Sequence, residues 1–539
     1  MFDAGKLTYP SMRYPLFSDM GMVCTTSAQA SAAGIGMLRA GGNAMDAIVA
    51  AASSLTVTEP TSNGLGSDAF ALIWSEKEHR LYGLNGSGQA PGLATIEAVH
   101  ARHPESGGKM PRMGWTPVTV PGAVGAWCAI NRKFGSKPLK EVLGPAAGYA
   151  SYGYPVGAVL TDNWNRAAEH YRSVLKGPEF DEWFRVFAPE GRKLRAGDMV
   201  RLPDAAETLQ EIGETGGESF YRGRIAALID RESRRYGGFL RADDLERYEP
   251  LWVEPASVDY RGYTVCEIPP NGQGMVALMA LNILRNFSFT VREEPRTFHL
   301  QMEAMKLAFA DGLHYITDPD SMELDYRRLL LPEYGASRAE EITGEARVYT
   351  HAVPPGSGTV YLCSADSEGN MVSYIQSNYM GFGSGIVVSG TGIALQNRGS
   401  DFSLDPSDAN CLMPCKRTYH TIIPGFLMKD GDAVGPFGVM GGYMQPQGHL
   451  QTIMNLLDFG MNPQQALDAP RWMWEKGRTF AVEPEMDSHI LNDLKARGHD
   501  IHVAQNRGIF GRGQMIIRLE NGVLCGGTEP RADSSIAML

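Results

Sequence analysis

Residues 358–377 read GTVYLCSADSEGNMVSYIQS and decide the fold. Two runs rich in β-branched and aromatic residues flank Ser367-Glu368-Gly369-Asn370, a pattern that predicts a hairpin of two strands joined by a tight turn. Directly before them, residues 348–358 (VYTHAVPPGSG) hold two prolines and several small residues, so we expect an irregular loop there. Thr359 is therefore predicted to stand at the first position of a strand, immediately after a loop.

The position of Thr359 suggests a particular chemistry. A threonine hydroxyl is a weak nucleophile unless a base lies close to it. Cleavage of the Gly358–Thr359 bond, through an N-to-O acyl shift, would give Thr359 a base in its own α-amino group. The pKa of such a group is about 7.7–8.0, so much of it is neutral at working pH. Glycine suits the position before the cut because it leaves its carbonyl open and its dihedrals permissive.

The surrounding sequence predicts a mixed α/β protein. Residues 25–54 are rich in alanine and glycine and predict two closely packed helices, separated at Gly41-Gly42, with Asn43 capping the second. Residues 69–88 (AFALIWSEKEHRLYGLNGSG) predict a second hairpin. These segments lack the glycine pattern of a nucleotide-binding loop, so close packing is the favoured interpretation.

A long amphipathic helix is predicted for residues 296–316, RTFHLQMEAMKLAFADGLHYI. His299 and His314 lie on it. Neither histidine has a metal-type partner nearby in the sequence, so both are expected to be partly buried polar residues.

Composition excludes several classes of function. The formal net charge of -12 argues against a nucleic-acid partner, and no apolar stretch is long enough for a membrane span. The seven cysteines are scattered, and the closest pair, Cys411 and Cys415, lacks further ligands for a metal. The first residues show no signal-peptide pattern. We therefore expect a cytoplasmic protein that acts on a small molecule and needs no metal or other cofactor.

Motif order carries a stronger signal than any single motif. From residue 358 onward the chain shows GT, DSEGN, GFGSGIV, GTGIALQNRGSDFS, KR, TIIP and GGYMQPQG in turn. This order resembles the small-subunit signature of γ-glutamyltransferases. Residues 21–47, 59–73, 259–270 and 302–319 are similar to large-subunit segments of the same family, so the resemblance covers the chain from about Gly21 to its end.

The resemblance implies an α/β fold, the four-layer αββα sandwich of N-terminal-nucleophile hydrolases. It also implies a precursor cut into two fragments, a large-subunit region 1–358 and a small-subunit region 359–539. Together the fragments would form one catalytic unit, a heterodimer, and a dimer of heterodimers is the larger assembly to consider.

The resemblance also assigns roles to individual residues. Thr359 matches the nucleophile, and Ser377 falls where the family has a second threonine that hydrogen-bonds it. Gly441 and Gly442 match the diglycine whose backbone N–H groups form the oxyanion hole, where each donor contributes about 2.7–4 kcal/mol. Asp401 matches the carboxylate that holds the substrate α-ammonium. Without the resemblance, the segments around the last three residues would be interpreted as turns.

Departures from the family pattern concern the substrate. Ser87 stands near the place of the arginine that holds the γ-glutamyl α-carboxylate, and a serine cannot supply a charged bidentate fork. The family's adjacent pair of serines becomes His420-Thr421, and an asparagine of the glutamyl pocket becomes Tyr379. This combination resembles the subgroup of class IV cephalosporin acylases and oxamate amidohydrolase.

Two residues of this pocket keep two interpretations each. Arg398 could bind the carboxylate of the acyl donor in place of the missing arginine, or pair with a nearby acid such as Asp401. His420 could contact the acyl group, or be a hydrogen-bonded histidine behind the pocket.

The leading hypothesis is a self-cleaving amidohydrolase or acyltransferase that forms an ester on Thr359. The acyl donor is a γ-glutamyl amide by family default, whereas the departures favour oxamate or a glutaryl-type amide. A Ser-His-Asp hydrolase is disfavoured because no G-x-S-x-G motif is present and the S-x-x-K at Ser173 stands alone. An unprocessed scaffold with the same fold is the non-enzyme alternative.

Overall fold

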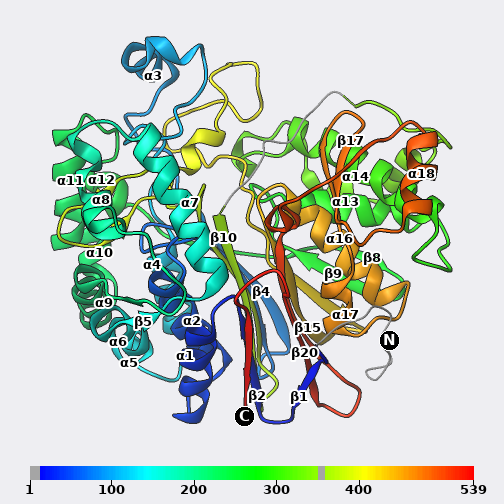
Figure 1. Ribbon diagram of the computed structural model, residues 1–539, viewed down its shortest axis with the longest axis horizontal. Helices are drawn as coiled ribbons and strands as arrows, with labels where there is room; N and C mark the ends of the chain where they lie inside the picture. The colour runs from blue at the N-terminus through cyan, green and yellow to red at the C-terminus, as the bar shows by residue number, and fades with distance from the viewer. Residues whose placement is uncertain (1–12, 350–357) are drawn as a thin grey trace.

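Two seven-stranded antiparallel sheets lie face to face in the centre of the protein, between layers of helices (Figure 1). The computed structural model describes residues 13–349 and 358–539. The first sheet contains, in spatial order, β21 (Ser535–Met538), β2 (Gly21–Thr25), β10 (Gly358–Asp366), β11 (Met371–Tyr379), β3 (Asp68–Ser75), β4 (Arg80–Gly86) and β7 (Leu251–Val253). The second contains β1 (Leu16–Ser18), β20 (Leu524–Thr528), β19 (Arg512–Arg518), β15 (Asp432–Met440), β14 (Gly425–Lys429), β9 (Tyr263–Glu267) and β8 (Ala256–Tyr260).

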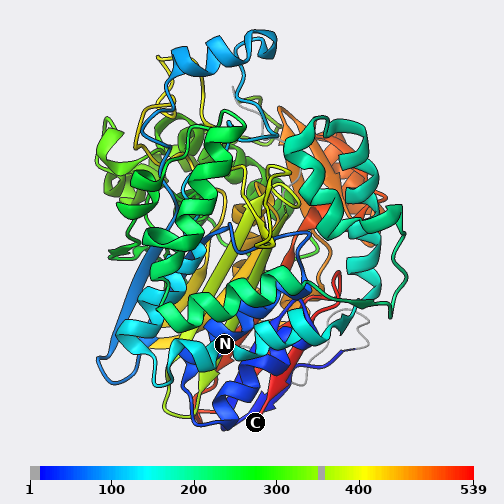
Figure 2. The ribbon, with the colours of Figure 1, turned by 90° about the vertical axis from the view of Figure 1, so that its left-hand side faces the viewer.

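Helices from the first half of the chain form the layer outside the first sheet (Figures 1 and 2). They are α1 (Ala28–Arg39), α2 (Ala44–Thr58), α4 (Ala123–Phe134), α5 (Leu139–Val142), α6 (Gly144–Tyr152), α7 (Ala158–Val174), α8 (Asp181–Phe187), α9 (Pro203–Thr215), α10 (Glu218–Arg222), α11 (Arg224–Arg235) and α12 (Ala242–Glu246), with α3 (Ile96–Arg102) standing apart. The cap predicted for α2 is present, since the Asn43 side chain accepts from the backbone N–H groups of Met45 and Asp46 at 3.0 Å.

Helices from the second half form the layer outside the second sheet. They are α13 (Gly274–Leu284), α14 (Pro295–Tyr315), α15 (Pro332–Ala339), α16 (Met444–Leu457), α17 (Pro463–Asp468) and α18 (Ser488–Ala496). Small sheets complete the molecule: β16 (Trp472–Lys476) with β17 (Thr479–Val482) and β18 (Asp500–Val503), β5 (Tyr154–Pro155) with β6 (Met199–Val200), and β12 (Val387–Val388) with β13 (Ile393–Ala394). None of the helices within the described residues has the length and apolarity to cross a membrane.

Strands in the middle of the first sheet are covered on both faces. All nine residues of β11 are buried, and Phe70, Trp74, Tyr361 and Phe426 fill the space between the sheets. A strand buried on both sides gains from apolar side chains on each, which accounts for apolar runs without polar alternation. The αββα architecture expected from the sequence is confirmed.

Both sheets contain strands from before and after the Gly358–Thr359 bond, where the sequence predicts a cut. β10 and β11, which follow the bond, lie between β2 and β3, which precede it. In the second sheet, β14 of the later region pairs with β9 of the earlier one. Neither region therefore completes a sheet without the other.

The predicted hairpins and helices agree with the structure. β10 and β11 flank the predicted turn, β3 and β4 form the second hairpin, and α14 covers the predicted amphipathic helix. The strand of Thr359 begins one residue earlier than predicted, at Gly358. Most of the predicted loop before it, residues 350–357, lies outside the described residues.

Candidate active site

Thr359 lies out of register at the start of β10. The pairing of β10 with β11 passes from Gly358 and Tyr379 to Val360 and Gln376, so Thr359 has no partner in this ladder. Such an irregularity re-aims a side chain away from the regular pleat. Thr359 is fully buried in this uncut chain.

Ser377 of β11 connects Thr359 with the carbonyl of the preceding residue. Its hydroxyl donates to the Gly358 carbonyl oxygen at 2.7 Å, and its oxygen lies 3.1 Å from Thr359 Oγ1. A serine has one hydroxyl hydrogen, so the Thr359 hydroxyl must be the donor to Ser377 Oγ. The backbone N–H of Tyr379 also donates to Ser377 Oγ, at 2.8 Å. This geometry polarises the Gly358 carbonyl and orients the Thr359 hydroxyl.

Gly358 fits a space that has no room for a side chain. A β-carbon there would lie 2.9 Å from the Thr61 carbonyl oxygen and 3.0 Å from both Gly381 N and Ser62 Cα. Real β-carbons do not approach backbone atoms so closely without a shift of the chain. Glycine is therefore required at this position by close packing as well as by the openness of its carbonyl.

Gly441 and Gly442 form the bend between β15 and α16. Their φ angles are +143° and +60°, which residues with a side chain adopt with strain. The bend precedes the N-terminus of α16, whose dipole favours negative charge. Gln273 holds this bend, because its Nε2 donates to the carbonyls of Gly442 at 2.8 Å and Thr421 at 2.5 Å. Sequence reasoning missed Gln273, since nothing local distinguishes the segment NGQG from a turn.

Arg398 lies at the centre of a buried polar cluster and is 1% exposed. Its Nη1 donates to Asp401 Oδ2 at 3.1 Å and to Thr421 Oγ1 at 2.7 Å. The guanidinium carbon lies 4.0 Å from the ring centroid of Tyr379, whose hydroxyl donates to Asp401. Among the described residues, Arg398 Nε and Nη2 have no hydrogen-bond partner. These two N–H groups share one edge of the guanidinium, so that edge is unpaired although both atoms are buried.

The contacts of Asp401 bear on its predicted role. Both carboxylate oxygens are used, one by Tyr379 and one by Arg398. Burial raises the pKa of Asp401, although the nearby Arg398 acts to lower it. The ion pair that was one interpretation of Arg398 is thus present, and it leaves Nε and Nη2 without a partner among the described residues.

His420 is fully buried and hydrogen-bonded behind this cluster. Its Nε2 lies 3.0 Å from Asp68 Oδ2, and Asp68 also accepts from the backbone N–H groups of Gly88 and Gly122. Burial lowers the pKa of His420 well below its usual range, and the charge of Arg398 adds to this effect. Burial raises the pKa of Asp68 to about 7, against the opposing effect of Arg398. Of its two interpretations, His420 matches the hydrogen-bonded one.

Ser87, which replaces the expected arginine, is also buried. It donates to Asn85 Oδ1 at 2.7 Å, and Asn271 Nδ2 donates to Ser87 Oγ at 3.3 Å. Asn271 in turn accepts from the backbone N–H of His420 at 2.9 Å. Ser87 thus belongs to the wall behind His420 and provides no charge.

A cavity of about 700 Å³ borders the Gly358–Thr359 bond. Gly358 and Gly441 both line it, so the bond and the diglycine bend face the same space. Its apolar surface comes from Ala167, Met380, Met440, Met473 and Ile509, and its cationic side chains are Arg166, Lys476 and Arg512. Arg512 pairs with Glu59 at 3.3 Å, whereas the structure gives Arg166 and Lys476 no carboxylate partner within the described residues.

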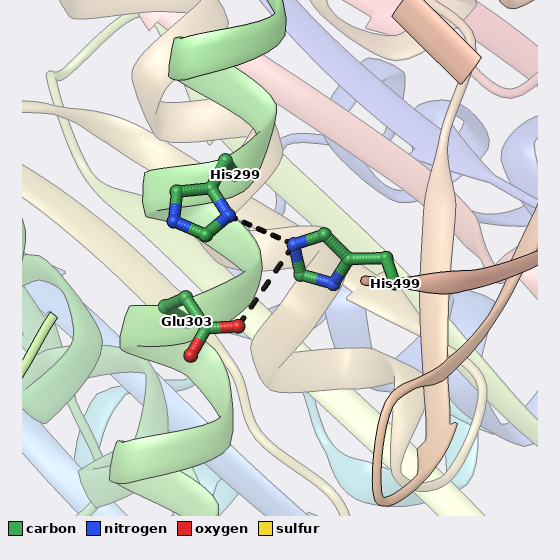
Figure 3. Close-up of side chains that lie close together, drawn as sticks. All are labelled: His299, Glu303 and His499. Carbon is green, nitrogen blue, oxygen red and sulfur yellow. Dashed lines mark hydrogen bonds and ion pairs between the residues drawn. The ribbon is translucent and has the colours of Figure 1, made fainter. Parts of the chain in front are cut away.

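The structure places the two histidines of α14 in different surroundings. Figure 3 shows His299 of α14 beside His499, with Glu303 one turn further along the helix. One ligand atom from each of the three side chains lies within 4.8 Å of the other two, a spacing that could hold a metal ion. The sequence gave no indication of this group because the two histidines are 200 positions apart. His314, by contrast, is exposed.

Comparison with known proteins agrees with this geometry. The family described as Gamma-glutamyltranspeptidase matches residues 30–539. The chain belongs to this family. It is therefore an amide-cleaving enzyme of a family made as self-processing proenzymes, and it belongs to the N-terminal-nucleophile hydrolases.

Individual relatives of this family member have different names. A glutathione hydrolase-like proenzyme of Bacillus subtilis is 36% identical over 95% of this chain and 97% of its own. An oxamate amidohydrolase proenzyme of Klebsiella pneumoniae is 32% identical over 96% and 98%. The crystal structure of a cephalosporin acylase from Bacillus halodurans superposes with a TM-score of 0.95 at 52% identity, covering 100% of this chain and 99% of that one.

Proposed function

We propose that this family member is a threonine amidohydrolase that cuts itself between Gly358 and Thr359. The Thr359 hydroxyl attacks the Gly358 carbonyl carbon, the C–N bond breaks, and the acyl group moves to oxygen as an ester. Water then hydrolyses the ester, leaving a carboxylate on Gly358 and a free amine on Thr359. That amine serves as the base for the same hydroxyl in later turnovers.

The external reaction repeats this chemistry on a substrate amide. Thr359 forms an acyl ester and releases the amine, and the backbone N–H groups of Gly441 and Gly442 stabilise the oxyanion. Water or a second amine then takes the acyl group. The bond network of Ser377 supports this proposal, because one hydroxyl contacts both the nucleophile and the carbonyl of its first target.

The unpaired edge of Arg398 supports the proposal for the substrate. Two parallel N–H groups match the two oxygens of a carboxylate, and a buried charged donor left unpaired is costly. We therefore propose that Arg398 binds an acid group on the acyl donor. Tyr379, stacked on the guanidinium, keeps the fork in one plane.

The donor is better described as a diacid monoamide of the glutaryl type than as a γ-glutamyl amide. A γ-glutamyl group adds an α-ammonium, and the predicted partner for it, Asp401, already serves Arg398 and Tyr379. Close contact of the ammonium with Arg398 would also be repulsive. The second candidate is oxamate, a smaller acid amide that could use the same fork.

The cavity beside Gly358 favours a leaving amine larger than ammonia. Hydrolysis of oxamate releases only ammonia. Ammonia would occupy a small part of a cavity of about 700 Å³. Arg166 and Lys476 suit an amine that carries an acid group of its own. This observation supports the glutaryl-type donor over oxamate.

Kinetics with three donors test the substrate. We expect glutaryl anilide to give the highest kcat/KM, followed by γ-glutamyl anilide and then oxamate. Replacing Arg398 by Met should raise KM for glutaryl anilide by about 10²-fold, the loss of a buried charge-assisted pair. Lys77→Ala, in the exposed turn between β3 and β4, is the control. An unchanged KM in Arg398→Met would refute the carboxylate role.

The proposed cut between Gly358 and Thr359 also determines the subunit composition of the enzyme. Residues 1–358 and 359–539 would form the large-subunit and small-subunit regions and stay together as a heterodimer; sedimentation tests whether two such units pair. A denaturing gel separates the enzyme, with two bands, from an intact scaffold. All seven cysteines are free of disulfides, which supports a cytoplasmic location that fractionation would test.

A further inference from the structure

The chain just before the cleavage site is held by its backbone. Thr343, Gly344, Glu345 and Arg347 are exposed, whereas Ala346 is buried. Nevertheless, carbonyl or N–H groups of most of this segment, residues 343–347, are hydrogen-bonded to two other parts of the protein. Its position therefore depends on the groups that contact it more than on its own side chains.

Helix α14 supplies the first set of contacts. His299 Nε2 lies 2.7 Å from the Thr343 carbonyl oxygen, and Lys306 Nζ donates to the Arg347 carbonyl at 2.6 Å. The backbone N–H of Arg347 donates to Glu303 Oε2 at 3.3 Å. His299, Glu303 and Lys306 are at most 1% exposed, and their spacing along the chain places them on one face of the helix.

The second set comes from residues that follow the cleavage site. The backbone N–H of Ala346 donates to the Arg497 carbonyl at 2.8 Å, and Arg497 Nη1 donates to the Gly344 carbonyl at 3.3 Å. His499 Nε2 lies 2.9 Å from His299 Nδ1, so it supports the histidine that holds Thr343 (Figure 3). Residues 343–347 thus lie between α14 and the chain that leads into β18.

The charges in this group favour hydrogen bonding over a metal ion. Lys306 Nζ lies 2.5 Å from Glu303 Oε1, the same oxygen that faces His499, so the carboxylate already has a cation. A divalent ion there would be close to a buried ammonium, which is strongly unfavourable. Burial lowers the pKa of both histidines, that of His499 to about 3, and neutral rings suit a hydrogen-bonded pair.

We infer that His299, Glu303, Lys306 and His499 form a clamp that fixes residues 343–347 of the large fragment. The clamp grips backbone atoms, and it joins α14 to a residue of the small fragment. After self-cleavage, it keeps the large fragment attached to the small one as far as Arg347. This consequence rests on the proposed cut at Gly358, whereas the clamp itself exists in the uncut chain.

An estimate of chain entropy shows that the clamp has little effect on the rate of self-cleavage. Loss of the clamp would release residues 343–347 and so lengthen a loop that ends at Gly358 by about five residues. Closure entropy scales with the logarithm of length, so the rate of self-cleavage should change by less than about twofold. The clamp therefore acts on the position of residues 343–347 and leaves the cleavage chemistry nearly unchanged.

Limited trypsin digestion tests the clamp. Trypsin cuts after arginine, and the Arg347 side chain is exposed while its carbonyl is held by Lys306. We expect His299→Phe and Lys306→Met to accelerate cutting at Arg347–Val348 at least tenfold relative to cutting at the exposed Lys193, measured by mass spectrometry. Using the ratio removes any change in global stability. The assay works equally on Thr359→Ala, so a failed clamp and a failed proposal for Thr359 give different results.

Three further variants complete the test. His299→Gln keeps an N–H donor near the position of Nε2 and should restore protection, which a merely space-filling role would not predict. Arg497→Ala, milder because Arg497 is partly exposed, should give an intermediate ratio even if the buried variants fail to fold. His314→Ala, on the exposed side of α14, should behave as the wild type. Equal ratios in all variants, or stoichiometric zinc bound by the wild type and lost in His299→Phe, would overturn the inference.

Discussion

At the scale of single residues, the hydroxyl of Ser377 has two partners with different tasks. It donates to the Gly358 carbonyl oxygen and accepts from Thr359, so it contacts both the nucleophile and the oxygen of the carbonyl that is attacked. Replacing Ser377 by Ala should slow self-cleavage about 10²-fold, the typical effect of removing one donor to a developing oxyanion. The rate is measured on denaturing gels after purification of the uncut chain. Ser373→Ala, four positions earlier on β11, is the matched control.

Gly358 gives a second prediction at this scale. Gly358→Ala places a β-carbon 2.9 Å from the Thr61 carbonyl, so the backbone must move and the carbonyl leaves its place beside Ser377. We expect self-cleavage to slow at least tenfold while the uncut chain still folds. Gly344→Ala is the control, because a β-carbon there meets nothing within 4 Å. Equal cleavage rates in the two variants would contradict the steric argument.

At the scale of elements, the paired histidines between α14 and β18 make stability depend on pH. In the folded state the pKa of His499 is about 3 and that of His299 is lowered, whereas in an unfolded chain both lie near 6.5. Below pH 6.5 the unfolded chain binds more protons, so the free energy of unfolding falls as the pH decreases from 6.5 toward 3. The charged groups around the pair are Lys306, Arg497, Arg478 and Glu303.

Denaturant unfolding of the uncut Thr359→Ala chain at several pH values measures this effect. Each proton contributes a slope of about 1.4 kcal/mol per pH unit. His499→Gln keeps a donor toward His299 but cannot titrate, so its free energy of unfolding should fall less steeply between pH 6 and pH 4. Identical slopes for the two proteins would show that His499 does not carry the effect.

Elements were easier to predict than the contacts between them. The hairpin at Thr359, the cap at Asn43 and helix α14 follow from local patterns, and the structure agrees with each. Gln273 and His499 act only through partners far away in the chain, His499 through a histidine 200 positions earlier. Such pairings arise from the packing of layers, which no local periodicity encodes.

At the scale of the whole molecule, both sheets combine strands from before and after the proposed cleavage site. The uncut chain can assemble them by intramolecular folding, whereas two separate fragments must first meet. We therefore expect Thr359→Ala to regain its native circular dichroism after dilution from guanidinium, and the processed enzyme to regain less than about a tenth of its activity. Yield of the processed form should rise with protein concentration. Equal, concentration-independent yields would contradict this expectation.

The position of β10 and β11 in the centre of the first sheet has one more consequence. Once the bond before Thr359 is cut, the molecule keeps its native fold, but the separated fragments refold to it poorly. The half-life of the active enzyme is then set by its rate of unfolding. It is no longer set by an equilibrium between folded and unfolded chains. The peptide bond whose proposed cleavage creates the catalytic amine also links the two regions while the chain folds. In this proposal, activation and loss of the ability to refold are the same event.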